Sequence, residues 1–278
     1  MNDKERNKRF RASRSAVVKR QTRIIQDTEA EIRQLLKLAN EEITLILANA
    51  PTDWEQFYLP QLQQSVNVAM TQFGGAATAT VGLGARLSTE TGVALIEEPL
   101  AAGGVRIVGA VPRIDPPQLQ AMRTFMTGRI KDISLSAANT INSELGLTAI
   151  GVQSQGQAVA HIQRLLQNGS RSRAITIVRT ELGRAYSVAS DQRFRESQPF
   201  LPGLKKEWRK SGRIHSRPRH DAINGQVREV DKPFTLANGT QLMFPRDPKA
   251  PAGETINCGC TSLPFMAHWE TVGLPIAT

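Results

Sequence analysis

An unbroken apolar repeat near the start of the chain leaves few folds open to it. Apolar residues recur every seven residues across residues 15–50, at Val18, Ile25, Ile32, Ala39 and Ile46. No proline or glycine interrupts this segment, and Pro51 follows it. The spacing predicts a helix of roughly 35 residues, about 50 Å long. One such helix cannot bury its own apolar stripe, so we expect it to pack against other long helices.

The rest of the chain changes character after residue 199. Helical spacing is expected in residues 54–73, 116–146, 154–167 and 172–196, and Asn168-Gly169 is expected to cap the third of these helices. Beyond Pro199, glycine and proline punctuate short strand-like runs, and Asn238-Gly239 predicts a hairpin turn. The sequence therefore predicts an α+β chain, with long N-terminal helices packed as a helical region and a small β-rich C-terminal domain.

Three parts are expected along the chain. Residues 1–23 predict a basic flexible arm, and residues 24–150 predict a helical region. Residues 74–111 are rich in glycine, alanine and threonine and poor in periodicity, so we interpret them as a loop or small β element inserted between helices. Residues 151–278 are expected to form the third part. We expect neither a secretory signal nor a transmembrane helix.

The charge balance indicates an acidic partner. Lys and Arg number 35 against 25 Asp and Glu, a net charge of +10. Residues 1–25 and residues 193–219 each carry a net charge of +7. Both segments are candidates for contacts with phosphates of DNA, and the second fits an acidic protein surface equally well. The candidate nucleic-acid contacts are Lys4, Arg6, Lys8, Arg9, Arg11, Arg14, Lys205, Lys206, Arg209 and Lys210.

The two cysteines stand one residue apart near the end of the chain, at Cys258 and Cys260. A disulfide between them would be strained, whereas His220 and His215 supply two further ligands for a tetrahedral zinc ion. The hypothesis is a metal site of His215, His220, Cys258 and Cys260. The alternative is a pair of semi-buried thiols beside a histidine that hydrogen-bonds to a turn.

Six short motifs follow one another in a fixed order. They are Arg179-Thr180-Glu181, Lys206-Glu207-Trp208, Arg217-Pro218-Arg219-His220, Pro233-Phe234, Pro245-Arg246-Asp247-Pro248 and Asn257-Cys258-Gly259-Cys260. Together this set resembles the phage head morphogenesis domain, found in the F-type minor head proteins of Mu-like phages, over about residues 150–264. The sequence differs from the family at Gly259, where arginine is usual. It also carries Arg213 and His215 where an acidic residue often precedes the turn.

The resemblance implies a structural protein of the virion. Residues 151–278 would form the head morphogenesis domain, stabilised by Arg179, Glu181, Trp208, Arg217 and Asp247. The implied function is that of a minor head protein that associates with the portal and other capsid components and acts in head assembly, DNA packaging or ejection. Its place would be the phage head, assembled in the host cytoplasm, with no membrane involved. Double-stranded DNA would be bound without sequence specificity.

Two other functions stay open at this stage. One is a transient DNA-binding assembly factor, and the other is a zinc-dependent enzyme acting on nucleic acid or protein. The enzyme needs a carboxylate such as Glu181 beside the metal. Because no nucleophile, base and orienting group can be placed together from the sequence, we expect no enzymatic activity. We expect no cofactor other than a structural zinc ion.

Overall fold

The structure is a computed structural model that describes residues 2–50, 58–107, 116–212 and 216–273. Long helices come first, and the α+β prediction is confirmed. These helices are α1 (Asp3–Ala48), α2 (Leu59–Ala102), α3 (Pro116–Ala149), α4 (Gln155–Arg164) and α5 (Arg171–Ser197). A π-helical turn, Leu165–Ser170, joins α4 to α5 without a break, so the predicted helix end at Asn168-Gly169 is wrong. Among the described residues, no helix is long and apolar enough to cross a membrane.

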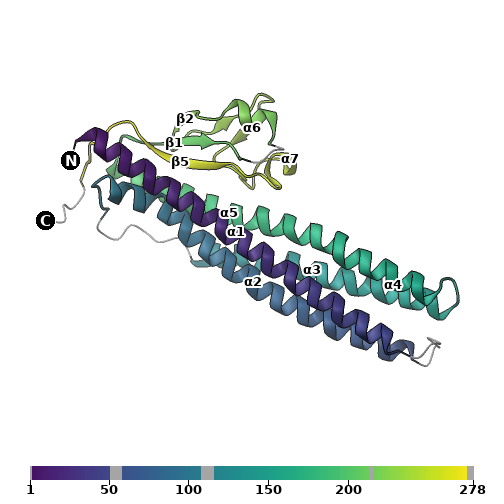
Figure 1. Ribbon diagram of the computed structural model, residues 1–278. Coiled ribbons are helices and arrows are strands. Elements are labelled where there is room, and N and C mark those ends of the chain that lie inside the picture. The colour runs from purple at the N-terminus through teal and green to yellow at the C-terminus, as the bar shows by residue number, and fades with distance from the viewer. Residues whose placement is uncertain (1, 51–57, 108–115, 213–215, 274–278) are drawn as a thin grey trace. The chain divides into compact units, whose positions relative to one another are not determined.

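Short strands follow α5 and the 3-10 turn Gln198–Phe200. The central strand β1 (Leu204–Arg209) pairs antiparallel with β2 (Val227–Glu229) on one side and β5 (Thr261–Met266) on the other (Figure 1). A separate hairpin pairs β3 (Phe234–Thr235) with β4 (Gln241–Leu242). Its turn contains Gly239 at φ +79°, which confirms the hairpin predicted at Asn238-Gly239. Two short helices lie between the strands, α6 (Pro218–Ala222) and α7 (Ala252–Thr255).

The chain divides into two compact units, each built from separate segments. The first unit comprises Met1–Gln26, Gly84–Met122 and Arg179–Thr278, and the second comprises Asp27–Leu83 and Arg123–Val178. Helices α1, α2, α3 and α5 contribute residues to both units. The predicted boundary after residue 23 falls inside α1, whereas the one at residue 150 falls just after α3.

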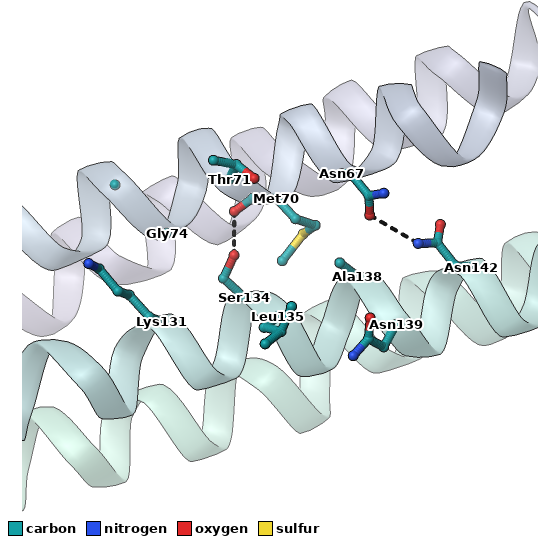
Figure 2. Close-up of a pocket in the computed structure, with 11 residues that line it drawn as sticks. Asn67, Met70, Thr71, Gly74, Lys131, Ser134, Leu135, Ala138, Asn139 and Asn142 are labelled. Atoms are coloured by element: carbon teal, nitrogen blue, oxygen red, sulfur yellow. Dashed lines mark hydrogen bonds between the residues drawn. The ribbon is translucent and has the colours of Figure 1, made fainter. Parts of the chain in front are cut away.

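The second unit is helical and buries the apolar stripe of α1. Of the predicted seven-residue repeat, Ile32 and Ala39 are buried here and Ile46 is half-buried. Three neighbouring apolar residues complete the buried face of the helix: Leu36, Ile43 and Leu47. Polar contacts join α2 to α3 in the same unit (Figure 2). Ser134 donates a hydrogen bond to the carbonyl of Met70, and the Asn142 amide donates to Asn67 at 2.9 Å. A β-carbon at Gly74 would lie 2.9 Å from the Ser134 hydroxyl, so glycine permits this approach.

The N-terminal segment is a docked helix, so the prediction of a flexible arm is wrong. Phe10 and Val17 lie in the core of the first unit, and Phe10 packs edge-on against Trp269. Arg14 donates to the Glu207 carboxylate at 3.0 Å and to the Pro264 carbonyl at 2.8 Å. Burial of Phe10 and Val17 holds the segment against the first unit, despite the repulsion among its positive charges.

The Gly-rich stretch is helical as far as Ala102, which corrects the prediction of a loop or β element at residues 74–111. Gly74 and Gly92 approach neighbouring helices closely, whereas Gly75 and Gly82 have nothing within 4 Å of an added β-carbon. A β-carbon at Gly92 would lie 2.5 Å from the carbonyl oxygen of Tyr186 and 2.8 Å from the β-carbon of Ala189. Glycine here serves close helix packing, which a sequence pattern cannot distinguish from a turn signal. Residues 108–111 lie outside the described residues.

Candidate metal centre

Three predicted metal ligands meet in the first unit. His220 lies on α6, whose first residue, Pro218, suits the start of a helix because its missing N–H would be unpaired there. Cys258 and Cys260 lie in the turn between α7 and β5. All three side chains are buried, and their ligand atoms lie within 4.8 Å of one another. Both cysteines are free thiols. The structure therefore joins residues that are 38 and 40 positions apart.

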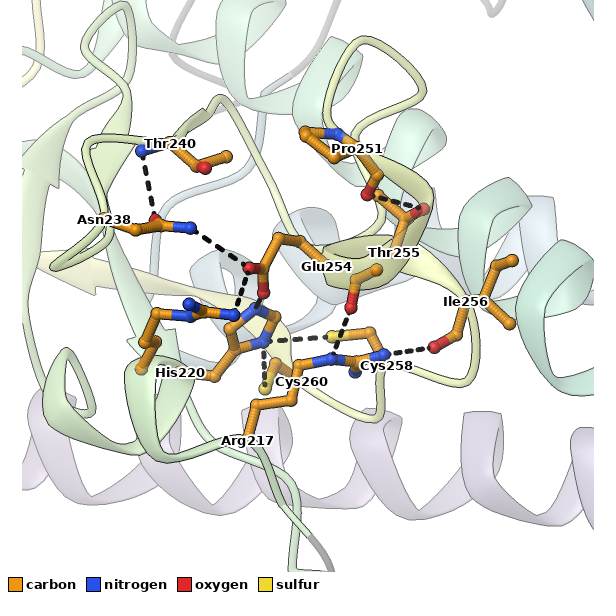
Figure 3. Close-up of polar contacts among 12 residues, drawn as sticks. Arg217, His220, Asn238, Thr240, Pro251, Glu254, Thr255, Ile256, Cys258 and Cys260 are labelled. Carbon is orange, nitrogen blue, oxygen red and sulfur yellow. Dashed lines mark hydrogen bonds and ion pairs between the residues drawn. The ribbon is translucent and has the colours of Figure 1, made fainter.

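Glu254 on α7 orients the His220 ring. The ring Nε2 lies 3.0 Å from the Glu254 carboxylate, and Nδ1 lies 3.5 Å from the Cys258 sulphur and 3.7 Å from the Cys260 sulphur (Figure 3). A carboxylate only accepts hydrogen bonds, so it holds the proton of a neutral ring on Nε2. The lone pair of Nδ1 then points at the two sulphurs. Arg219, at 3.0 Å, also pairs with Glu254.

The loop that carries the cysteines is held by polar contacts on two sides. Arg217 donates from Nε to the Gly253 carbonyl and from Nη2 to the Ile256 carbonyl, both at 2.7 Å. The backbone N–H of Asn257 donates to the Thr180 hydroxyl on α5 at 3.0 Å. Asn257 adopts φ +56°, the left-handed conformation that asparagine tolerates better than most residues. These contacts fix the direction of the loop as it enters Cys258.

Arg246 connects the cysteine loop to α5 from inside the protein. Its Nε donates to the Cys258 carbonyl at 2.7 Å, and its Nη1 donates to the Gly183 carbonyl at 2.9 Å and the Ser187 hydroxyl at 3.0 Å. Arg246 is buried and adopts φ +66°. A β-carbon at Gly183 would lie 2.5 Å from the guanidinium carbon. Glycine at this position therefore makes room for the guanidinium group.

The two thiols share a hydrogen bond, and this separates their acidities. The hydrogen bond from Cys260 lowers the pKa of Cys258. Burial acts in the opposite direction, whereas His220 and the positive charge of Arg246 lower this pKa further. The same hydrogen bond raises the pKa of Cys260, and burial raises it further. Soft, deprotonatable sulphurs beside a neutral imidazole are the ligands that zinc prefers.

An open cavity of about 670 Å³ adjoins the cluster. His220, Cys258 and Cys260 contribute to its wall, together with Arg179 and Arg217. Solvent in the cavity therefore reaches the cluster from a side that carries positive charge.

The other predicted site residues lie in different places. His215 lies outside the described residues, so its part in a metal site stays a prediction. Glu181 is buried and pairs with Arg184 at 2.7 Å, and it does not belong to the cavity wall that the structure describes. Asp247 accepts hydrogen bonds from the backbone of Met243 and Lys249 at 2.9 and 3.0 Å, which stabilises the turn before Pro248.

Trp208 packs against His220 in the interior of the first unit. It is completely buried on β1, and its ring meets His220 edge-on at 5.4 Å and Phe234 at 5.1 Å. Trp208 and Phe234 belong to one apolar cluster with Cys258 and Cys260. Trp208 and Phe234, from the second and fourth motifs, thus pack against His220 of the third motif and the two cysteines of the sixth. Their stabilising role stays a prediction, which is developed in the Discussion.

One candidate nucleic-acid contact is wrong. Lys206 is completely buried on the inward face of β1, and its ammonium group donates to the Met243 carbonyl at 2.7 Å. Side chains alternate along a strand, so Lys206 points to the same side as Leu204 and Trp208. It cannot contact phosphate in this fold.

The remaining basic candidates differ in how far they reach solvent. Arg14 is bound to Glu207, Lys205 pairs with Glu229, and Arg6 lies over the Trp269 ring. Arg9 pairs with Glu5 at the surface, and Lys210 lies 4.0 Å from Asp221. The exposed candidates are Lys4, Lys8, Arg9, Arg11, Arg209 and Lys210.

The burial of Lys206 predicts a pH-dependent stability. Burial lowers its pKa from 10.5 to about 8, with acidic neighbours opposing the shift. Below pH 8 the lysine is charged in both states, and keeping the charge buried costs about 3 kcal/mol. Between pH 8 and 10.5 the unfolded chain binds more protons, so this cost falls as pH rises. Relative to Lys206→Met, the natural protein should gain stability from pH 7.5 to 10, as measured by urea unfolding.

The matched control is Lys205→Met on the other face of the same strand. Lys205 is half-exposed, so the Lys205→Met variant should gain as much stability between pH 7.5 and 10 as the natural protein does. Equal pH slopes for the natural protein and Lys206→Met would contradict the assigned burial of the ammonium group.

Sequence reasoning missed Glu254, Arg219 and Arg246. Glu254 stands four residues before Cys258, and an acidic residue beside a predicted histidine–cysteine cluster is a signal that could have found it. Arg246 gave no such signal, because its partners are backbone carbonyls that only the folded chain brings together.

Comparisons with known proteins place the site within a recognised segment. Residues 149–263 match the family described as Phage Mu protein F like protein, as the motifs predicted. The NAD(+)--arginine ADP-ribosyltransferase EFV of Enterococcus faecalis is 31% identical over 112 residues, 39% of this chain and 23% of that protein. YqbB of Bacillus subtilis, described as uncharacterized, is 38% identical over 99 residues, 34% of this chain and 32% of that protein. The matches thus span less than a third of either relative. No solved structure matches the chain.

Proposed function

We propose that the protein is a minor head component of a tailed phage, because residues 149–263 match the family described as Phage Mu protein F like protein. The family indicates a phage head protein. The finer proposal is a virion protein that associates with the portal and other capsid proteins and acts in head assembly, DNA packaging or ejection. Its location is then the phage head, with no membrane partner.

The observation that carries the proposal is the family match, and the burial of the motif residues supports a structural reading. Trp208, His220, Cys258 and Cys260 are each at most 2% exposed. The Arg217 guanidinium group donates hydrogen bonds to backbone carbonyls of the cysteine loop. Residues arranged in this way hold a small domain together. A hydrolytic centre would instead place a carboxylate in the cavity as a base, and Glu181 is bound to Arg184.

The relative named as an ADP-ribosyltransferase raises the question of enzymatic activity. The name describes a whole protein of which the match covers 23%. We propose that the shared segment is not the transferase part, and that this chain is not an enzyme. Incubation with biotin-labelled NAD⁺ and an arginine-rich acceptor should transfer no label above a heat-denatured control. Transfer of label by the folded chain would contradict this part of the proposal.

The test of the head proposal is quantitative mass spectrometry of purified, nuclease-treated phage particles. The chain should be present at a low, fixed number of copies relative to the portal protein and the major capsid protein. Presence in procapsids but absence from mature particles would instead support the transient assembly factor. Absence from both would contradict a head function.

Non-specific binding to double-stranded DNA belongs to the same proposal. Lys4, Lys8 and Arg11 are exposed near the start of α1. Each phosphate contact adds about 0.9 to the slope of log K against log salt concentration. The triple variant Lys4→Gln, Lys8→Gln, Arg11→Gln should therefore bind a random duplex more weakly, with a slope shallower by roughly 2–3. Fluorescence anisotropy between 50 and 200 mM salt, roughly the range in which such contacts are sensitive, measures both.

The control removes the same charge from residues that are paired within their own helices. Arg33, Lys37 and Arg86 pair with Glu29, Glu41 and Glu90. Their triple glutamine variant should keep most of the salt slope. If both triple variants lose the slope equally, net charge alone drives binding and the start of α1 is not a DNA contact.

A further inference from the structure

We propose that His220, Cys258 and Cys260 bind one zinc ion, through the ring Nδ1 and two thiolate sulphurs. The proposal goes beyond the head function and does not depend on it, because it rests on the geometry of the first unit alone. All three ligand atoms converge within 4.8 Å in the interior of the protein.

The separations fit a single tetrahedral ion. Zinc bonds of about 2.3 Å to sulphur and about 2.1 Å to nitrogen, at tetrahedral angles, place nitrogen and sulphur roughly 3.6 Å apart. The Nδ1 atom of His220 lies 3.5 Å from one sulphur and 3.7 Å from the other. The side chains are therefore arranged around one point, and an ion at that point needs little movement of the loop.

Hydrogen bonding alone accounts for the cluster less well. A neutral ring with its proton on Nε2 offers one lone pair at Nδ1, so it accepts one S–H bond. The second sulphur then has only the hydrogen bond to the other thiol, although it lies at a similar distance from Nδ1. A zinc ion uses all three groups at once. Two thiolates also balance the charge of Zn²⁺, so the buried site is neutral.

The His220 ring has a carboxylate beside it, as histidine ligands in metal sites usually do. A histidine ligand usually donates its other ring N–H to a carboxylate, which fixes the tautomer and strengthens the ligand. Glu254 occupies that position at 3.0 Å, and it is buried as well. Arg219 and Asn238 bind the other carboxylate oxygen of Glu254, at 3.0 and 3.4 Å, and hold it in place.

The cavity beside the cluster supplies the fourth position. It is open to solvent and includes His220 and both cysteines in its wall. The cavity leaves room for a fourth ligand on that side, next to Arg179 and Arg217.

The experiment uses the full chain. Metal content is measured by mass spectrometry after purification without chelators, and the chelator-treated protein is then titrated with zinc chloride. About one zinc ion per chain is expected, with magnesium chloride giving no binding because Mg²⁺ prefers oxygen ligands. Cobalt chloride added to the metal-free protein should produce thiolate-to-cobalt charge-transfer bands and d–d bands of tetrahedral intensity. Folded protein that gives neither band would overturn the proposal.

The variants identify the ligands. Cys258→Ser with Cys260→Ser should abolish zinc binding, whereas His161→Asn, at a half-exposed histidine, should not change it. If the double cysteine variant does not fold, Glu254→Gln decides, because it retains both thiols and His220. It should weaken zinc binding about 10- to 100-fold, while the exposed control Glu229→Gln leaves the zinc Kd unchanged. Equal zinc Kd values for the natural protein, Glu254→Gln and Glu229→Gln would also overturn it.

Discussion

Trp208→Ala should destabilise the β-rich part by about 3–5 kcal/mol, the cost of removing a large, fully buried aromatic side chain. The indole packs against His220 and Phe234 and lies in the cluster that includes both cysteines. Its loss opens a cavity beside His220, Cys258 and Cys260. Hydrogen exchange of the β1 and β5 amides, followed by mass spectrometry, measures the change locally.

The control for Trp208 is Phe125→Ala on α3. Phe125 is 54% exposed, so its truncation should change stability by no more than about 0.5 kcal/mol. Trp208→Phe should fall between the two, because the smaller ring still fills part of the space. Exchange rates in β1 that are the same in Trp208→Ala as in the natural protein would show that the tryptophan does not support the sheet.

Arg246→Ala should cost about 3 kcal/mol, because it leaves the buried carbonyls of Cys258 and Gly183 without their donor. Gly183→Ala should act through the same contact. Its new methyl group would lie 2.5 Å from the guanidinium carbon and would displace it. The double variant should therefore cost clearly less than the sum of the two single variants. Thermal and urea unfolding of the four proteins complete the cycle.

The control for the glycine is Gly128→Ala on α3, where nothing lies within 4 Å of the added carbon. Alanine is the better helix former, so this variant should be stabilised by up to about 1 kcal/mol. Strict additivity of Arg246→Ala and Gly183→Ala would mean that the glycine does not act through the guanidinium.

The sequence indicated which cysteine and histidine residues lie together, whereas metal binding by them stays a prediction. Cys258, Cys260 and His220 were predicted from their ligand types, and the structure brings them together. Glu254 was not predicted, although its position four residues before Cys258 was a signal, because the sequence alone does not show that its side chain faces His220. Lys206 was assigned to the surface by its charge, although strand alternation places it beside Trp208 in the interior.

The sequence by itself determined the local structure of this protein. The apolar stripe of α1 and the turn at Asn238-Gly239 follow from short-range spacing and backbone preference. The similarity of residues 149–263 to the Phage Mu protein F like family likewise followed from the order of the motifs. Only the tertiary structure decided that Gly92 packs inside a helix against Tyr186 and that Arg14 binds Glu207 across 193 positions. Such contacts join segments far apart in the chain, and local sequence carries no record of which surfaces will meet.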